Sequence, residues 1–130
     1  MENPLESLIV SGEEVDKNLL VTVLADLVRV EKSTGEIRFI GVAPKLPKRI
    51  QILLFLLGRK AAKALDLIEE EAIAPSEMEV KLGVKGGPLR GQLFQLKNDR
   101  LVQSEGGKYR VPNYALEAVK ELLGARTGGK

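Results

Sequence analysis

The residues best suited to a chemical task are the cations, glycines and glutamines between residues 85 and 110. Lysine and arginine side chains can neutralise phosphates, and arginine or glutamine can also hydrogen-bond to base edges in a DNA groove. Glycine allows a backbone to come close to a ligand. The candidate DNA-binding residues are Lys85, Gly86, Gly87, Arg90, Gln92, Gln95, Lys97, Lys108 and Arg110. These residues predict contact with a double-stranded nucleic acid, without covalent chemistry.

The charge of the chain is divided unevenly between its two parts. Residues 1–44 hold eight acidic and four basic side chains, a net charge of −4, whereas residues 45–130 hold sixteen basic and ten acidic ones, a net charge of +6. Within residues 81–110, seven basic side chains stand against Asp99 and Glu105, which gives +5. A positive patch confined to one module favours a polyanionic partner. A solvated, lysine-rich surface would have the same composition.

Cysteine and histidine are both absent from the 130 residues. Their absence excludes disulfides, thiolate metal sites, thiol nucleophiles and the commonest general base. We therefore expect no enzymatic activity, no cofactor and no metal site. The longest apolar run, residues 52–57, is too short to span a bilayer, and the first residues lack the charged region of a signal peptide. These features predict a cytoplasmic protein without membrane contact.

Apolar spacing predicts a helix and then a β-hairpin in the first third of the chain. Leu20, Leu24 and Leu27 recur at helical spacing. The alternating residues of segment 28–40 indicate a hairpin, with Gly35 at a positive φ in its turn.

A long helix is predicted to follow a proline-containing linker at residues 44–47 and to run from about residue 48 to about residue 70. Its apolar residues extend nearly all round the first two turns, so it must be covered on two sides. We expect the hairpin on one side and the C-terminal module on the other, although a dimer partner could supply one cover. Three cations are predicted on its exposed face: Arg59, Lys60 and Lys63. The acidic run 69–71 is expected to be a solvated helix end.

The next segment has the pattern of two helices joined by a tight turn. Ser76 and Glu79 have the spacing of a capping box at the start of a short helix, residues 76–82, which ends at Gly83. Pro88 suits the first turn of the following helix, predicted over about residues 88–99. One face of this helix carries Leu89, Leu93 and Leu96.

A second hairpin and a last helix are predicted beyond the paired helices. Strands at 101–102 and 109–111 flank the turn at 105–107, so that a basic hairpin spans about residues 104–110. Asn113 is expected to cap a final helix, residues 115–123. Residues 124–130 are expected to form a disordered tail.

The segment GVKGGPLRGQLFQLKNDRLVQSEGGKYRV, residues 83–111, resembles the recognition helix and wing of a winged helix-turn-helix domain. The pattern Pro88-Leu89-Arg90-x-x-Leu93-x-x-Leu96, followed by Arg100-Leu101-Val102, is similar to that of GntR-type and MarR-type repressors. The resemblance covers about residues 48–111. It implies a DNA-binding transcriptional regulator that acts as a homodimer. The family's DNA contacts would carry over to Lys85, Gly86, Gly87, Arg90 and Lys108.

The expected fold class is mainly α with small β-hairpins (α+β), a winged helix-turn-helix domain at residues 45–123 preceded by a helix-and-hairpin extension at residues 1–44. A second interpretation is a winged helix that binds a protein partner within a larger assembly. The acidic first third and the small net charge of the whole chain favour this alternative.

Individual residues also have purely structural interpretations. Arg90 could simply pair with Glu77 or Glu79. Phe94 lies roughly 140° from the apolar stripe of its helix. It is expected to pack beneath the wing, although it could instead mark a partner surface.

Overall fold

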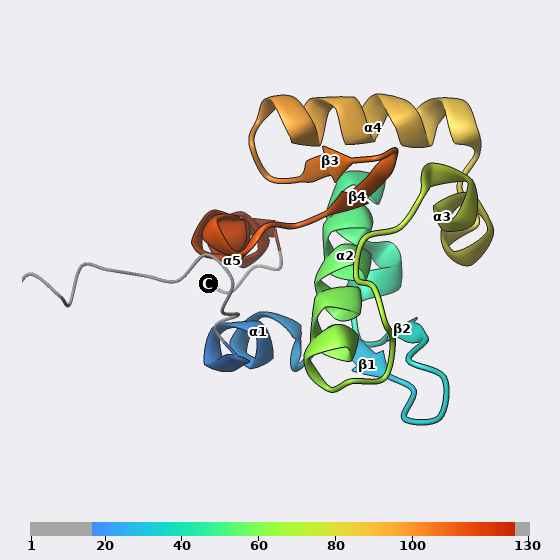
Figure 1. Ribbon diagram of the computed structural model, residues 1–130. Coiled ribbons are helices and arrows are strands. Elements are labelled where there is room, and N and C mark those ends of the chain that lie inside the picture. The colour runs from blue at the N-terminus through green and yellow to red at the C-terminus, as the bar shows by residue number, and fades with distance from the viewer. Residues whose placement is uncertain (1–16, 127–130) are drawn as a thin grey trace, which may run out of the picture.

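The computed structural model describes residues 17–126, which form five α-helices and two antiparallel two-stranded hairpins (Figure 1). The chain therefore has the mixed α+β class that the sequence predicts. The elements in order are α1 (Lys17–Leu24), β1 (Val28–Val30), β2 (Ile37–Phe39), a 3-10 turn (Ala43–Lys45), α2 (Lys48–Ala64), α3 (Pro75–Leu82), α4 (Gly86–Asn98), β3 (Gln103–Glu105), β4 (Lys108–Arg110), a second 3-10 turn (Asn113–Ala115) and α5 (Leu116–Arg126).

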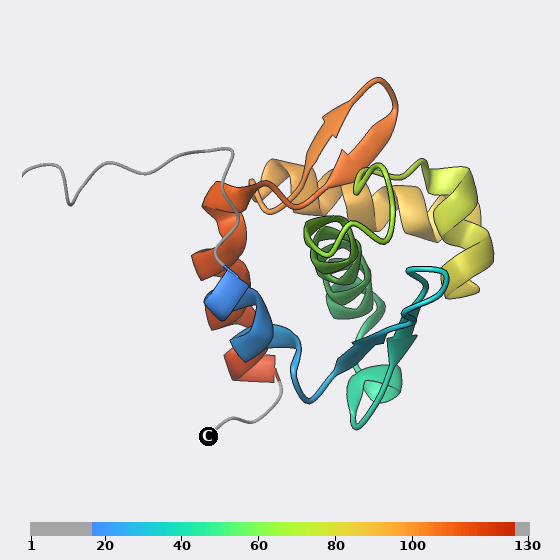
Figure 2. The same ribbon diagram turned by 60° about the horizontal axis from the view of Figure 1, so that its bottom comes forward.

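Helix α2 lies at the centre of the fold, as its apolar circumference predicts. All residues from Ile50 to Gly58 are buried. The α1 helix and the β1–β2 hairpin pack on α2, and α4 and β4 pack on it as well, so that α2 is enclosed by the other elements (Figure 2). A Cβ atom on Gly58 would lie 2.9 Å from Cγ2 of Ile37, which shows how closely the first hairpin approaches this helix.

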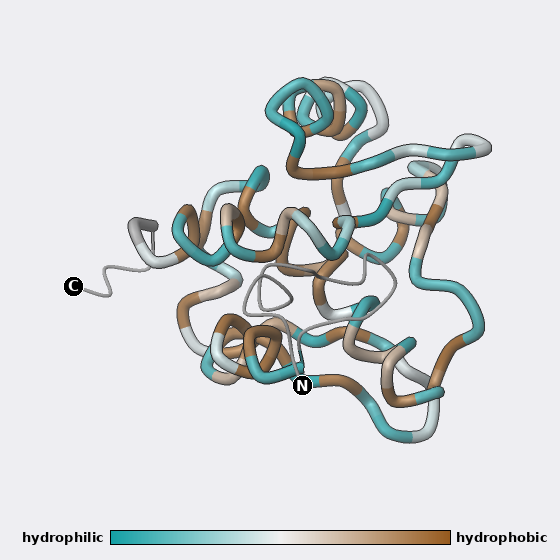
Figure 3. Tube along the Cα trace, turned by 60° about the vertical axis from the view of Figure 1, so that its left-hand side comes forward, coloured by the Kyte–Doolittle hydropathy of each residue, from teal (hydrophilic) through white to brown (hydrophobic). Residues whose placement is uncertain are grey.

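The core that surrounds α2 is continuous from the first helix to the last. Buried residues of α1, α2, α4 and α5 belong to one hydrophobic cluster, which extends from Leu20 to Leu123. Hydrophobic and hydrophilic residues are interspersed along the chain trace (Figure 3), and the outer helices bury an apolar face against this core. None of the helices between Lys17 and Arg126 is long and apolar enough to cross a bilayer.

The prediction that the long helix continues to residue 70 is wrong, because α2 ends at Ala64. Asp66 adopts a left-handed conformation with φ of 61°. The backbone N–H of Leu67 then donates to the carbonyl of Ala62 at 2.9 Å, a Schellman-type ending. The acidic run 69–71 consequently lies in a loop and not on the helix.

The predicted capping box at the start of α3 is also wrong. Pro75 is the first residue of the helix, Ala74 occupies the N-cap position, and no side chain caps the helix. Proline is favoured at the first helical position because its missing N–H needs no partner there. Ser76 therefore falls inside the helix, two residues after the N-cap position.

The turn between α3 and α4 matches the predicted geometry. Gly83 has φ of 67° and its N–H donates to the carbonyl of Glu79, so it ends α3. Three residues, 83–85, connect the two helices. Helix α4 starts at Gly86, two residues before the predicted start, and places Pro88 in its first turn. Its stripe of Leu89, Leu93 and Leu96 is fully buried, as predicted.

The second hairpin forms with the predicted turn. Gly106 and Gly107 have φ of 61° and 81°, the positive values that a tight I′ hairpin turn requires. The predicted strand at 101–102 is wrong: both residues are buried, but β3 begins only at residue 103. Ile73 exchanges two backbone hydrogen bonds with Tyr109 at 2.9 and 3.0 Å, so the segment before α3 pairs with this hairpin.

Helix α5 closes the fold by packing on α1. It continues to Arg126, so residues 124–126 of the predicted disordered tail are helical instead. The helix continues past Gly124 because a single glycine lowers helix stability without breaking the helix. The remaining tail residues 127–130, and residues 1–16 of the predicted extension, lie outside the described residues.

Candidate nucleic-acid interface

The predicted site residues lie on α4, on the turn before it and on the β3–β4 hairpin. These elements occupy one end of the described part of the molecule, and α1 occupies the other (Figure 1). Six of the nine predicted site residues are exposed: Lys85, Gly87, Arg90, Gln95, Lys97 and Lys108. The other three, Gly86, Gln92 and Arg110, are partly exposed. The described part of the first forty residues does not cover the start of α4.

The face of α4 opposite the buried leucines is open and uncharged. Gly87, Gly91, Phe94 and Asn98 follow one another at helical spacing along this face, and all are exposed. A Cβ atom on Gly87 or Gly91 would meet no other atom within 4 Å. No packing contact within residues 17–126 therefore requires glycine at these two positions.

The prediction that Phe94 packs beneath the wing is wrong, since its side chain is 61% exposed. Its place on the helix, roughly 140° from the leucine stripe that faces α2, turns it toward solvent. No described element crosses this face, so the ring remains in contact with solvent.

Arg90 lies at the edge of this face and has an acidic partner on α3. Its Nη1 atom lies 3.5 Å from Oε2 of Glu79, which is one of the two acids considered from the sequence. The Arg90 side chain is nevertheless 60% exposed. Exposed ion pairs of this kind contribute about 0–1 kcal/mol, so the guanidinium can exchange its carboxylate for a phosphate at small cost.

The Glu79 side chain also lies close to the glycine at the start of α4. A Cβ atom on Gly86 would lie 2.6 Å from Oε2 of Glu79. The atoms nearest to such a Cβ are the flexible side-chain ends of Glu79 and Arg90, so these contacts do not require glycine at position 86.

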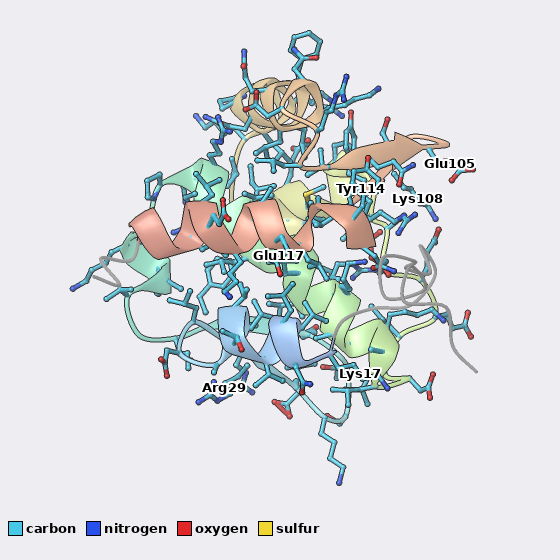
Figure 4. All side chains as sticks on the ribbon, turned by 90° about the vertical axis from the view of Figure 1, so that its left-hand side faces the viewer. Lys17, Arg29, Glu105, Lys108, Tyr114 and Glu117 are labelled. Carbon is cyan, nitrogen blue, oxygen red and sulfur yellow. The ribbon has the colours of Figure 1, made fainter. Side chains whose placement is uncertain are left out.

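The cations of the hairpin are also held by acids, and these acids come from the loop after α2. Nζ of Lys108 lies 2.7 Å from Oε1 of Glu70, and Nη1 of Arg110 lies 4.0 Å from Oε2 of Glu71. Figure 4 labels Lys108 on the hairpin beside α4. The expectation that the acidic run is a solvated helix end is thus wrong, because the early end of α2 brings it beside the hairpin.

Lys60 is buried, which contradicts its predicted place on the exposed face of the long helix. Its side chain is only 1% exposed, and its Nζ donates to Oε2 of Glu71 and Oδ1 of Asn113, both at 2.7 Å. Burial lowers the pKa of the Lys60 ammonium, and the hydrogen bond to Glu71 opposes this shift. The burial is tolerated because two acceptors compensate the lost hydration.

Arg59 fixes the same loop through its backbone. Its Nε donates to the carbonyl of Glu71 at 2.9 Å, and its Nη2 donates to the carbonyl of Glu70 at 2.7 Å. Burial lowers the pKa of Arg59, although nearby carboxylates favour its charged form. Together with Lys60, it attaches the acidic loop to α2 and so positions the hairpin that rests on it. This network joins distant segments, and no local spacing in the sequence indicates it.

Three cations around α4 remain exposed without an acidic partner among residues 17–126. Lys85 precedes the helix, Lys97 lies in its last turn, and Arg100 follows it with φ of 62°. Sequence reasoning counted Arg100 as a charge but missed it as a site residue. Its position directly after the predicted helix could have indicated that it lies at the same surface. By contrast, Arg49 pairs with Asp99 at 2.5 Å.

The described residues offer charge and shape for binding a polyanion. Among them, no group of three or more potential metal-ligating side chains is present. Comparison with known proteins finds no family model, no curated protein and no solved structure that matches the chain. Assignment of a function therefore depends on the residues of this surface.

Proposed function

We propose that the protein binds double-stranded DNA as a winged helix-turn-helix protein that regulates transcription as a homodimer. In this proposal α4 is the recognition helix and the β3–β4 hairpin is the wing. The element order supports it: a central helix, an isolated β-bridge at Ile73, two helices joined by a three-residue turn, and a hairpin. A helix presented by such a turn can enter the major groove.

The exposed cations around the open face of α4 are the observation that carries this proposal. Lys85, Lys97 and Arg100 have no acidic partner among the described residues, and Arg90 is held only by an exposed pair. Each can neutralise a phosphate beside the groove. Helix α4 adds the partial positive charge of its N-terminus, near Lys85. Lys108 of the wing would exchange Glu70 for a phosphate in the same way.

The salt dependence of DNA affinity tests this proposal. The full chain is titrated into a fluorescent duplex of random sequence at several salt concentrations. Each neutralised phosphate contributes about −0.9 to the slope of log K against log salt, so the five cations named above predict a slope of about −4.5 for each bound protomer. Removing one of them, as in Lys97→Ala, reduces the magnitude of the slope by about 0.9.

Lys17→Ala is the matched control, because it removes an exposed cation on α1, far from α4 (Figure 4). This variant keeps the slope of the unchanged protein. Binding that is independent of salt, or a slope that Lys97→Ala and Lys17→Ala reduce equally, contradicts the proposal.

A protein partner is the second candidate function, and the exposed ring of Phe94 favours it. Large aromatic side chains are enriched at protein interfaces, and the outer face of α4 carries no charge. The wing cations are also already paired with Glu70 and Glu71. This alternative predicts no binding to duplex DNA at low salt. It also predicts a stable hetero-complex in which Phe94 is protected from solvent.

A further inference from the structure

The side chain at position 94 is the one large apolar group on the outer face of α4 within the described residues. Phe94 is 61% exposed, whereas the three leucines of the same helix are fully buried. Helical side chains lean toward the N-terminus of their helix, so the ring extends over the preceding turn, where Gly91 leaves open space. The ring thus lies over the middle of α4, on the outer face that a recognition helix turns toward the groove.

Charge around this ring indicates which partner it meets. Arg90 and Lys97 lie beside the face that carries Phe94, and Lys85 and Arg100 lie at the two ends of α4. An apolar protein partner would have to desolvate these cations, whereas a duplex supplies phosphates for them and presents an apolar group between them. In the major groove that group is the C5-methyl of thymine, which Phe side chains can contact.

We infer that Phe94 contacts thymine methyl groups in the major groove and gives the protein a preference for A·T pairs. This inference rests on the proposed DNA binding. It assigns base preference to an apolar contact on α4, while the cations supply affinity without regard to sequence. Gly87 and Gly91 have no side chain that would keep the helix away from the bases.

Replacing thymine by uracil in the duplex tests this inference, because it removes the methyl group and leaves the hydrogen-bonding edges unchanged. Affinity for an A·T-rich duplex is measured at low salt with thymidine and with deoxyuridine, for the unchanged protein and for Phe94→Ala. Burying one methyl is worth about a fourfold change in affinity, so the unchanged protein prefers the thymidine duplex by about fourfold for each contact. Phe94→Ala binds both duplexes equally.

Val21→Ala is the matched control, since Val21 is a similarly exposed apolar side chain that lies on α1, outside the proposed interface. This variant keeps the preference for thymidine. Thermal melting verifies that Phe94→Ala remains folded, as expected for the loss of an exposed side chain.

The possible failures are distinguishable. If the unchanged protein binds both duplexes equally and with the expected salt slope, the role of Phe94 is refuted and DNA binding stands. A preference that persists in Phe94→Ala also refutes it. If no duplex is bound at low salt, the proposed function fails, and the thymine contact fails with it.

Discussion

Replacing Glu71 by leucine tests whether its contact with Lys60 holds the loop that positions the β3–β4 hairpin. The substitution removes the carboxylate that accepts a hydrogen bond from Lys60 at 2.7 Å and that also faces Arg110 at 4.0 Å. Lys60 then remains 1% exposed with only Asn113 as an acceptor. Breaking a buried ion pair from one side typically costs about 3–5 kcal/mol, because a charge stays buried without compensation. We expect the free energy of unfolding to fall by about this amount.

The complementary change, Lys60→Met, has a smaller expected cost. Glu71 is 18% exposed and keeps Arg110 nearby, so its charge remains partly compensated. The double variant replaces the whole pair by apolar groups, which is often close to neutral. Urea denaturation of the four proteins measures these differences and gives the coupling energy.

Glu69→Leu is the matched control, because Glu69 belongs to the same loop and is exposed. Its cost should stay within about 0.5 kcal/mol. The reasoning is refuted if Glu71→Leu costs no more than Glu69→Leu, or if the double variant is as unstable as the sum of the single ones.

Three further predictions concern pH, the end of α4 and the pairing of Arg90. Because burial lowers the pKa of Lys60 in the folded protein, the unfolded chain holds this proton more tightly than the folded one. Stability should therefore rise with pH between the lowered pKa and the ordinary value of 10.5, and urea titrations of Lys60→Met should lack this component. Arg100 has φ of 62°, a conformation that costs a side chain about 1 kcal/mol or more. Arg100→Gly should accordingly raise the free energy of unfolding by up to about 1 kcal/mol while it weakens DNA binding. Gly83→Ala, at φ of 67°, should instead lower the free energy of unfolding. Equal effects of the two substitutions on stability would exclude backbone strain as the cause. Glu79→Gln should release Arg90 and strengthen DNA binding by about two- to fivefold, as measured by fluorescence anisotropy. An unchanged or weaker affinity would show that the Arg90–Glu79 pair does not compete with DNA.

Local patterns in the sequence were sufficient to predict most of the secondary structure. The stripe of Leu89, Leu93 and Leu96 and the turn at Gly83 depend on neighbouring residues, and both predictions are confirmed. The end of α2 was not predictable in the same way, because an aspartate such as Asp66 does not by itself indicate a left-handed conformation that ends a helix. The pairing of Ile73 with Tyr109 was missed because it joins segments far apart in the chain.

The sequence predicted the composition of the candidate site and the Arg90–Glu79 pair, but it did not predict the acidic partners of the hairpin cations. The cations lie on the expected elements, yet Lys108 and Arg110 are held by acids of a loop that was expected to be helical. Lys60 illustrates the same limit. Its buried ammonium donates to the side chain of Asn113, which lies far away in the sequence. The apolar periodicity of the helix that carries Lys60 could not predict this acceptor. Pairing between distant segments therefore determines how much charge the surface offers.

The location of the DNA contact on the protein tests the central claim most directly. Amide chemical shifts of the isotope-labelled protein are followed by NMR during titration with a random-sequence duplex at low salt. We expect the largest shifts at residues 85–100 and at Gly106 and Gly107 of the β3–β4 hairpin, whereas the shifts of α1 remain unchanged. Shifts confined to α1 and α5, or no shifts at all, would contradict this expectation.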